Sequence, residues 1–212
     1  MTDRPPKEPR KPRADALRNR ERVLTAAKLV FGQGAPNTSL EAVARQAGVG
    51  IGTLYRHFPT REALYEAVYR REVEYLVELA GTLRDTADPV DALRRWMRAN
   101  IEFIATKKGM IAALAVAVQG RSDLIAYSLE RLTTAVGELL QRAAEAGEIR
   151  DDISAEDMLR TLVGLCYAQD RPDWQASVLR LVDVFADGLR VRQHSPEWCH
   201  TSRGDQEPSR ST

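Results

Sequence analysis

Cysteine and histidine are scarce in this chain of 212 residues. Its two cysteines, Cys166 and Cys199, exclude a disulfide scaffold, and neither belongs to a Cys-x-x-Cys motif or a Cys/His cluster that would indicate a metal site. The three histidines, at positions 57, 194 and 200, have no nucleophile–base motif, phosphate-binding loop or ligand pair around them. We therefore expect no metal, no cofactor, no catalytic residues and a reduced, cytoplasmic setting.

Long hydrophobic runs are also missing. The longest extends only from Met110 to Val118, which is too short to span a bilayer. The N-terminus is basic and contains several prolines, and no apolar stretch follows it, so it does not have the pattern of a signal peptide. The sequence thus predicts no membrane partner.

Charge is balanced over the whole chain but not along it. Residues 1–72 carry a net charge of +6 and residues 73–212 a net charge of −5, which leaves +1 overall. This asymmetry favours a polyanionic partner for the basic front alone, although chance gives such totals too. A non-specific nucleic-acid-packaging protein would need positive charge over its whole length, so the acidic remainder argues against that class.

Apolar residues recur with helical period through nearly all of the chain, and no convincing run alternates as a β-strand does. The sequence therefore predicts an all-α fold. Serine, threonine and aspartate before several of these segments are typical helix N-caps. The expected helices cover, approximately, residues 15–32, 40–47, 51–57, 61–83, 89–106, 109–118, 122–146, 155–169 and 174–191.

Residues 40–58 have the pattern of a helix–turn–helix. Ala44 is small where two helices cross closely, and Gly48 permits the left-handed turn that redirects the chain. Val49 plugs the turn, and Leu54 anchors the second helix to the core together with Phe58. On a helical wheel, the side away from these anchors presents what a helix in a DNA groove needs: Gly52, Thr53 and Arg56 outermost, with Tyr55 and His57 on the flanks.

Residues 38–65 have the sequence TSLEAVARQAGVGIGTLYRHFPTREALY, which closely resembles the DNA-binding signature of the TetR (tetracycline-repressor-like) family. The layout of three short helices, a connecting helix and an all-helical remainder resembles that family too. The resemblance implies a homodimeric, ligand-responsive transcription factor, usually a repressor, on a palindromic operator. The alternative is a helix–turn–helix activator or a ligand-independent DNA-binding protein, and an enzyme is disfavoured.

Composition indicates a disordered arm and a flexible tail at the two ends of the chain, and the resemblance implies the two domains between them and a set of roles. Residues 1–13 form a disordered basic arm that either contacts DNA or is merely solvated, residues 14–60 the DNA-binding domain, residues 61–192 the ligand-binding and dimerisation bundle, and residues 193–212 a flexible tail. The implied DNA contacts are to bases from Thr53 and Arg56, with close backbone approach at Gly52, and to phosphates from Thr38 or Ser39, Tyr55, His57 and Arg61. Gly50 departs from the family, which often has Ser or Thr there, so the second helix loses a cap and a phosphate donor.

For the bundle, the resemblance implies an internal small-molecule pocket. Residues with apolar or hydrogen-bonding side chains in its helices are candidate linings, although any one of them can equally be core: Trp96, Met97, Asn100, Met110, Leu114 and Tyr127. Few buried charges are evident, so we expect a largely apolar effector.

The last two helices carry broad apolar faces, which are either covered by their own domain or paired with a twin, as in the family's four-helix interface. We expect the second arrangement. The candidate dimer residues are Leu159, Leu162, Val163 and Cys166 on one helix, and Val178, Val182, Phe185 and Leu189 on the other.

Overall fold

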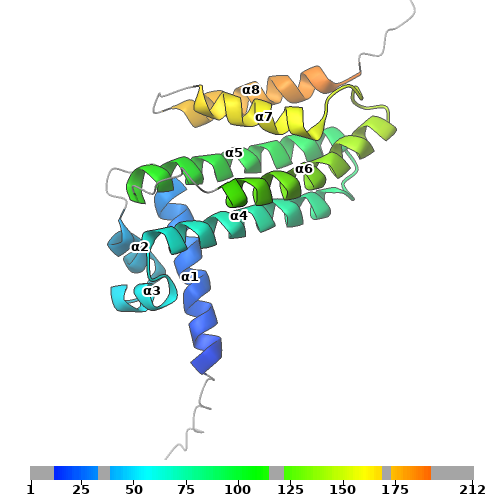
Figure 1. Ribbon diagram of the computed structural model, residues 1–212. Coiled ribbons are helices and arrows are strands. Elements are labelled where there is room, and N and C mark those ends of the chain that lie inside the picture. The colour runs from blue at the N-terminus through cyan, green and yellow to red at the C-terminus, as the bar shows by residue number, and fades with distance from the viewer. Residues whose placement is uncertain (1–11, 33–38, 115–121, 169–172, 192–212) are drawn as a thin grey trace, which may run out of the picture.

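The computed structural model describes residues 12–32, 39–114, 122–168 and 173–191 (Figure 1). The expected basic arm and flexible tail lie almost entirely outside these ranges. Within them the chain forms eight helices: α1 (Pro12–Gly32), α2 (Leu40–Ala47), α3 (Ile51–His57), α4 (Arg61–Leu83), α5 (Pro89–Leu114), α6 (Ser122–Glu145), α7 (Ala155–Tyr167) and α8 (Trp174–Leu189). The predicted all-α class is confirmed. None of these helices has the length and apolarity needed to cross a membrane.

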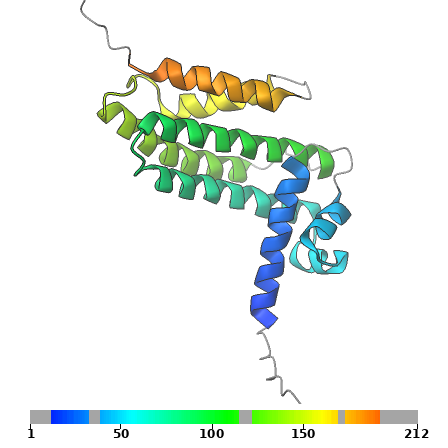
Figure 2. The same ribbon diagram turned by 180° about the vertical axis from the view of Figure 1, so that it is seen from behind.

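The helices form a bundle with a smaller three-helix group at one end. Helices α4, α5 and α6 run side by side, and α7 and α8 cover the face of α5 opposite α4 (Figures 1 and 2). Helix α1 crosses the end of the bundle and projects beyond it, with α2 and α3 packed on its side (Figure 2). The α2–α3 pair is therefore carried outside the bundle, where a large partner can reach it.

Local capping chemistry accounts for several helix boundaries. Ser39, Thr60 and Ser154 are N-caps whose hydroxyls accept hydrogen bonds from the backbone N–H three residues on, at 3.2, 3.1 and 3.1 Å. Asp88 accepts from two backbone N–H groups, at 2.8 and 2.9 Å, and Gly147 ends α6 near φ 70°. These caps lie where the sequence predicts them, and they settle on Ser39 rather than Thr38 as the N-cap of α2.

One predicted boundary is wrong. The sequence places a break between residues 106 and 109, but α5 continues unbroken from Pro89 to Leu114. Gly109 is present because α1 comes very close: a Cβ there would lie 1.9 Å from the carbonyl oxygen of Phe31. The glycine allows two helices to touch and does not end one of them.

Polar contacts fasten the outer helices to α5 and α4. The guanidinium of Arg98 on α5 pairs with Asp183 on α8 at 2.6 Å. The Lys28 ammonium on α1 pairs with the buried carboxylate of Glu72 on α4, also at 2.6 Å. A single apolar core runs from α1–α3 into the bundle, so the three-helix group is continuous with the rest of the fold.

Candidate functional site

The turn between α2 and α3 has the geometry of a helix–turn–helix. Gly48 adopts a left-handed conformation, with φ 62° and ψ 38°, and a Cβ there would meet the Arg22 guanidinium at 2.5 Å. That guanidinium donates to the Gly48 carbonyl at 3.1 Å and so clamps the turn to α1. Ala44 is buried and Val49 packs against the core, which is what the sequence predicts for them.

Helix α3 is anchored on one side and open on the other. Leu54 is completely buried and Phe58 is 3% exposed. Gly52, Tyr55 and Arg56 are exposed, whereas Thr53 and His57 are half-buried on the flanks of the anchor. No described residue forms a hydrogen bond or ion pair with the side chain of Tyr55 or Arg56. The outer face of α3 is therefore free to contact a partner.

Two further predicted contacts border this face. Ser39 caps α2, and Arg61 is the exposed first residue of α4; Thr38 lies outside the described residues. The pKa of the Glu41 carboxyl is lowered, chiefly by hydrogen bonds from its own backbone N–H and the Ser39 hydroxyl, and further by Arg61. Arg45, exposed in the last turn of α2, adds a cation that the sequence motif does not single out.

The helix N-cap at Gly50 lacks a side-chain hydrogen bond, as expected from its departure from the family pattern. Its φ is −68°, and a Cβ built there meets no atom within 4 Å. A hydroxyl-bearing side chain therefore fits this position without any change of backbone.

The predicted pocket residues do not converge on one cavity. Trp96, Met97, Asn100 and Met110 are buried on α5, while the side chain of Leu114 lies outside the described part of the chain. Tyr127 is half-buried on α6, where its hydroxyl donates to Glu74 of α4 and the Arg70 guanidinium lies 4.7 Å from its ring centroid. The described residues thus place these candidates along α5 and at the outer α4–α6 contact.

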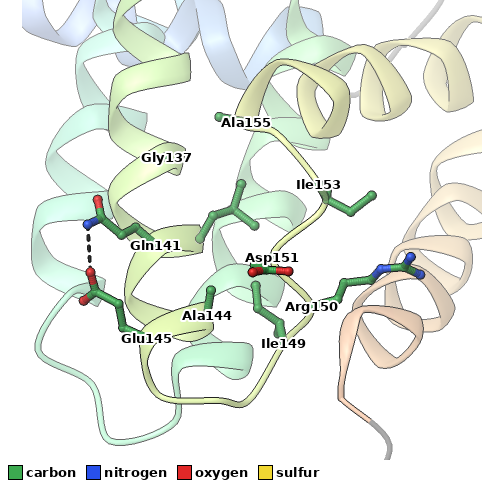
Figure 3. A pocket seen from close by; sticks show the side chains of 10 residues that line it. Gly137, Gln141, Ala144, Glu145, Ile149, Arg150, Asp151, Ile153 and Ala155 are labelled. Atoms are coloured by element: carbon green, nitrogen blue, oxygen red, sulfur yellow. Dashed lines mark hydrogen bonds between the residues drawn. The ribbon is translucent and has the colours of Figure 1, made fainter.

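A surface hollow of about 490 Å³ opens elsewhere, between the end of α6 and the segment that leads to α7 (Figure 3). Small and aliphatic side chains line much of it, and on its rim Gln141 donates to Glu145 at 2.8 Å. None of the predicted pocket residues belongs to its lining, which comprises Gly137, Leu140, Gln141, Ala144, Glu145, Ile149, Arg150, Asp151, Ile153 and Ala155.

Two polar groups on α5 stand out because of what surrounds them. The side-chain oxygen of Asn100 is buried without a hydrogen-bond partner. Lys107, which no sequence motif singles out, is half-buried 5.7 Å from the Tyr69 ring centroid, and burial lowers the pKa of its ammonium. The sequence alone could not distinguish Lys107 from its neighbour Lys108, which is the same residue type but donates to the Cys166 carbonyl. Only the tertiary structure separates their surroundings.

The structure places most of the candidate dimer residues in the interior of their own chain. Six of the eight residues are at most 5% exposed within a single chain: Leu159, Leu162, Cys166, Val178, Val182 and Leu189. Within the single chain they pack into the core of their own bundle. Val163 is 46% exposed and Phe185 is half-buried, so these two remain available.

Other apolar residues of α7 and α8 are exposed. Tyr167 on α7 is 46% exposed, and on α8 Leu181 is 40% and Val184 69% exposed. At about 100° per residue, Val184 lies nearly opposite the buried set of α8, whereas Tyr167 and Leu181 lie beside the buried sets of their helices. An apolar surface of this kind on paired helices is suited to contact with another protein.

Comparison with known proteins agrees with the fold and the helix–turn–helix. A model of the bacterial regulatory proteins of the tetR family matches residues 23–68, and a model of the C-terminal domain of SbtR-like transcriptional regulators matches residues 88–191. The HTH-type transcriptional regulator UidR of Escherichia coli K12 is 27% identical over 187 residues, which cover 84% of this chain and 92% of UidR.

Solved structures agree as well. The TetR transcriptional regulator SCO0520 from Streptomyces coelicolor is 44% identical, with a TM-score of 0.70 over 81% of this chain and 98% of that one. A TetR transcription regulatory protein from Mycobacterium vanbaalenii is 35% identical, with a TM-score of 0.65 over 84% and 99% of the two chains. With its helix–turn–helix and helical C-terminal domain, the chain belongs to the TetR family of bacterial transcriptional regulators.

Proposed function

We propose that this regulator is a homodimeric repressor that binds a palindromic operator through α3 and leaves it when a small molecule binds within α4–α8. The observation that carries the proposal is the outer face of α3. There Tyr55 and Arg56 are exposed and unengaged, while Leu54 directly behind them is completely buried. Such side chains can contact a duplex without first breaking a contact within the protein.

In this proposal residues 14–60 bind DNA, residues 61–192 form the effector and dimer bundle, and residues 193–212 are a tail. Thr53 and Arg56 contact base edges, and Gly52 lets the α3 backbone approach the groove floor. The proposed phosphate contacts are Thr38 or Ser39, Tyr55, His57 and Arg61.

Dimerisation through the exposed side of α7 and α8 would pair the two α3 helices. A twofold dimer on adjacent half-sites sets them about 34–36 Å apart, one turn of the duplex.

Val184→Glu places a charge in the proposed interface and is expected to convert the dimer to 23.7 kDa monomers in sedimentation velocity. Leu129→Glu, on the exposed side of α6, is the matched control and should leave the dimer intact. A dimer that survives Val184→Glu would place the interface elsewhere.

For release, the effector has to favour one arrangement of the bundle over another. Shifting a 99:1 equilibrium to 1:99 needs about 5.5 kcal/mol of differential binding, which two sites per dimer can share. The bundle residues proposed to take part are Trp96, Met97, Asn100, Met110, Leu114 and Tyr127.

Operator contacts can be separated by a salt titration. A duplex is enriched from random sequence by the wild-type protein, and a scrambled duplex of equal length serves as the reference. Arg56→Ala should cost about 1–3 kcal/mol on the enriched duplex alone, if this residue contacts a guanine. Arg61→Ala should weaken both duplexes alike and reduce the salt slope by up to about 1 for each phosphate that the arginine no longer neutralises. Equal losses on both duplexes for Arg56→Ala would contradict its role, and failure to enrich any duplex would contradict the function.

A further inference from the structure

One face of α5 carries two polar groups without suitable partners. Asn100 is only 2% exposed, yet its side-chain oxygen accepts no hydrogen bond. Lys107 is half-buried, and its ammonium forms no ion pair or hydrogen bond with the described residues. A buried carbonyl oxygen needs a hydrogen-bond donor, and an ammonium needs an anion. The two groups therefore suit different ends of one ligand, a hydrogen-bond donor at Asn100 and an anion at Lys107.

Helical geometry places both groups on one line. Seven residues separate them, so they point within about 20° of each other and lie about 10 Å apart along the axis. Trp96 and Phe103 share this line and show where it faces. The Trp96 indole N–H donates to an α4 backbone carbonyl at 2.9 Å, and Phe103 packs edge-on against Tyr69 of α4, with 5.1 Å between ring centroids.

Neither the Tyr69 hydroxyl nor the Lys108 ammonium is available to bind an anion beside Lys107, because both already donate hydrogen bonds. The Tyr69 hydroxyl lies 2.7 Å from that of Ser128, which itself donates to the Ile125 carbonyl at 2.8 Å, so Tyr69 is the donor in their pair and its proton is occupied. Lys108 points to the other side of the helix, where it donates to the Cys166 carbonyl at 2.9 Å.

We propose that this face of α5, opposite Tyr69, binds an amphipathic organic acid. Its carboxylate pairs with the Lys107 ammonium, and a hydroxyl or amide group on the order of 10 Å away donates to the Asn100 oxygen. The apolar body of the acid lies between them and displaces the edge-on contact of Phe103 with Tyr69. The effector is thus an acid with an apolar body, and not a wholly apolar molecule.

The Lys107 end of this site lies close to the contact between α5 and α1, so a bound acid can affect DNA binding. In this respect the inference rests on the proposed function. Lys107 stands two residues before Gly109, whose backbone meets the Phe31 carbonyl of α1. An acid that moves this turn of α5 moves the helix on which α2 and α3 are packed.

The test uses the full chain and three related probes: 10-hydroxydecanoate, its methyl ester, and decanoate. By calorimetry, the wild-type protein should bind the hydroxy acid at least about tenfold more tightly than the ester, a difference of about 1.4 kcal/mol. It should also prefer the hydroxy acid to decanoate. Lys107→Met should abolish the preference for acid over ester, and Asn100→Leu the preference for the hydroxylated acid. Lys108→Met, which removes the same charge one residue away, should change neither.

Stability provides a second readout. Asn100→Leu removes a buried oxygen that accepts no hydrogen bond, and Lys107→Met removes a half-buried ammonium whose contact is with the Tyr69 ring, 5.7 Å from its centroid, so both variants should melt close to the wild type. Folding failure is therefore not expected to obscure the result.

Three results would overturn the inference: no binding of any probe by the wild type, an acid preference that persists in Lys107→Met, or an equal loss in Lys108→Met. DNA binding is measured separately by fluorescence anisotropy with the enriched duplex. A wild-type protein that binds no duplex overturns the proposed function and leaves the acid-binding comparison standing.

Discussion

Helix α3 and the pair α7–α8 differ in whether the residues singled out from the sequence are exposed or buried. In α3 the residues proposed to act are exposed, and Leu54 only anchors the helix. In α7 and α8 the residues chosen from the sequence are themselves the anchors, while Tyr167, Leu181 and Val184 face outward. Periodicity identifies a helix face, but it does not say whether the chain covers that face itself.

The reactivity of Cys166 tests whether the α7 residues singled out from the sequence are buried. Burial raises the pKa of its thiol to about 11. At pH 8 the thiolate is then on the order of 200-fold rarer than for a free cysteine, so a Cys199→Ser variant should react with Ellman's reagent at about 1% or less of its rate in denaturant. Because the folded pKa is the higher one, this group's contribution to stability is complete below about pH 8 and is lost as pH rises from there toward 11. Rapid labelling of the folded protein would place Cys166 on the surface.

Gly109→Ala tests the junction between the two regions. A methyl group 1.9 Å from the Phe31 carbonyl oxygen forces α1 and α5 apart, so the free energy of unfolding in urea should fall by about 1–3 kcal/mol or more. The control is Gly81→Ala on α4, where no atom lies within 4 Å and a gain of up to about 1 kcal/mol is expected. A similar gain at Gly109 would show that the close contact is absent.

Gly52→Ala separates stability from function on α3. No atom lies within 4 Å of the added methyl group, so the unfolding free energy should rise by up to about 1 kcal/mol. Affinity for the enriched duplex should nevertheless fall, because the methyl group keeps the α3 backbone away from the groove. Gly81→Ala should show the stability gain alone. Unchanged DNA affinity for Gly52→Ala would contradict close backbone approach.

The smallest effect is expected at the α3 N-cap. Gly50→Ser should add a few tenths of a kcal/mol to the unfolding free energy, whereas Gly50→Ala should lower it, because alanine caps worse than glycine. The serine hydroxyl should also strengthen binding to both the enriched and the scrambled duplex, as a phosphate donor does. A gain confined to one duplex would indicate a base contact instead.

The sequence by itself determined the all-α class, the helix–turn–helix and most helix ends. Caps such as Ser39, Thr60 and Asp88 bond to backbone two or three residues away, so their signal is local and readable. The tertiary structure decided the unbroken α5, the outward side of α7–α8, and the different surroundings of Lys107 and Lys108. Each of these depends on which distant helix packs against which face, and burial of that kind is set by contacts between residues far apart in the chain.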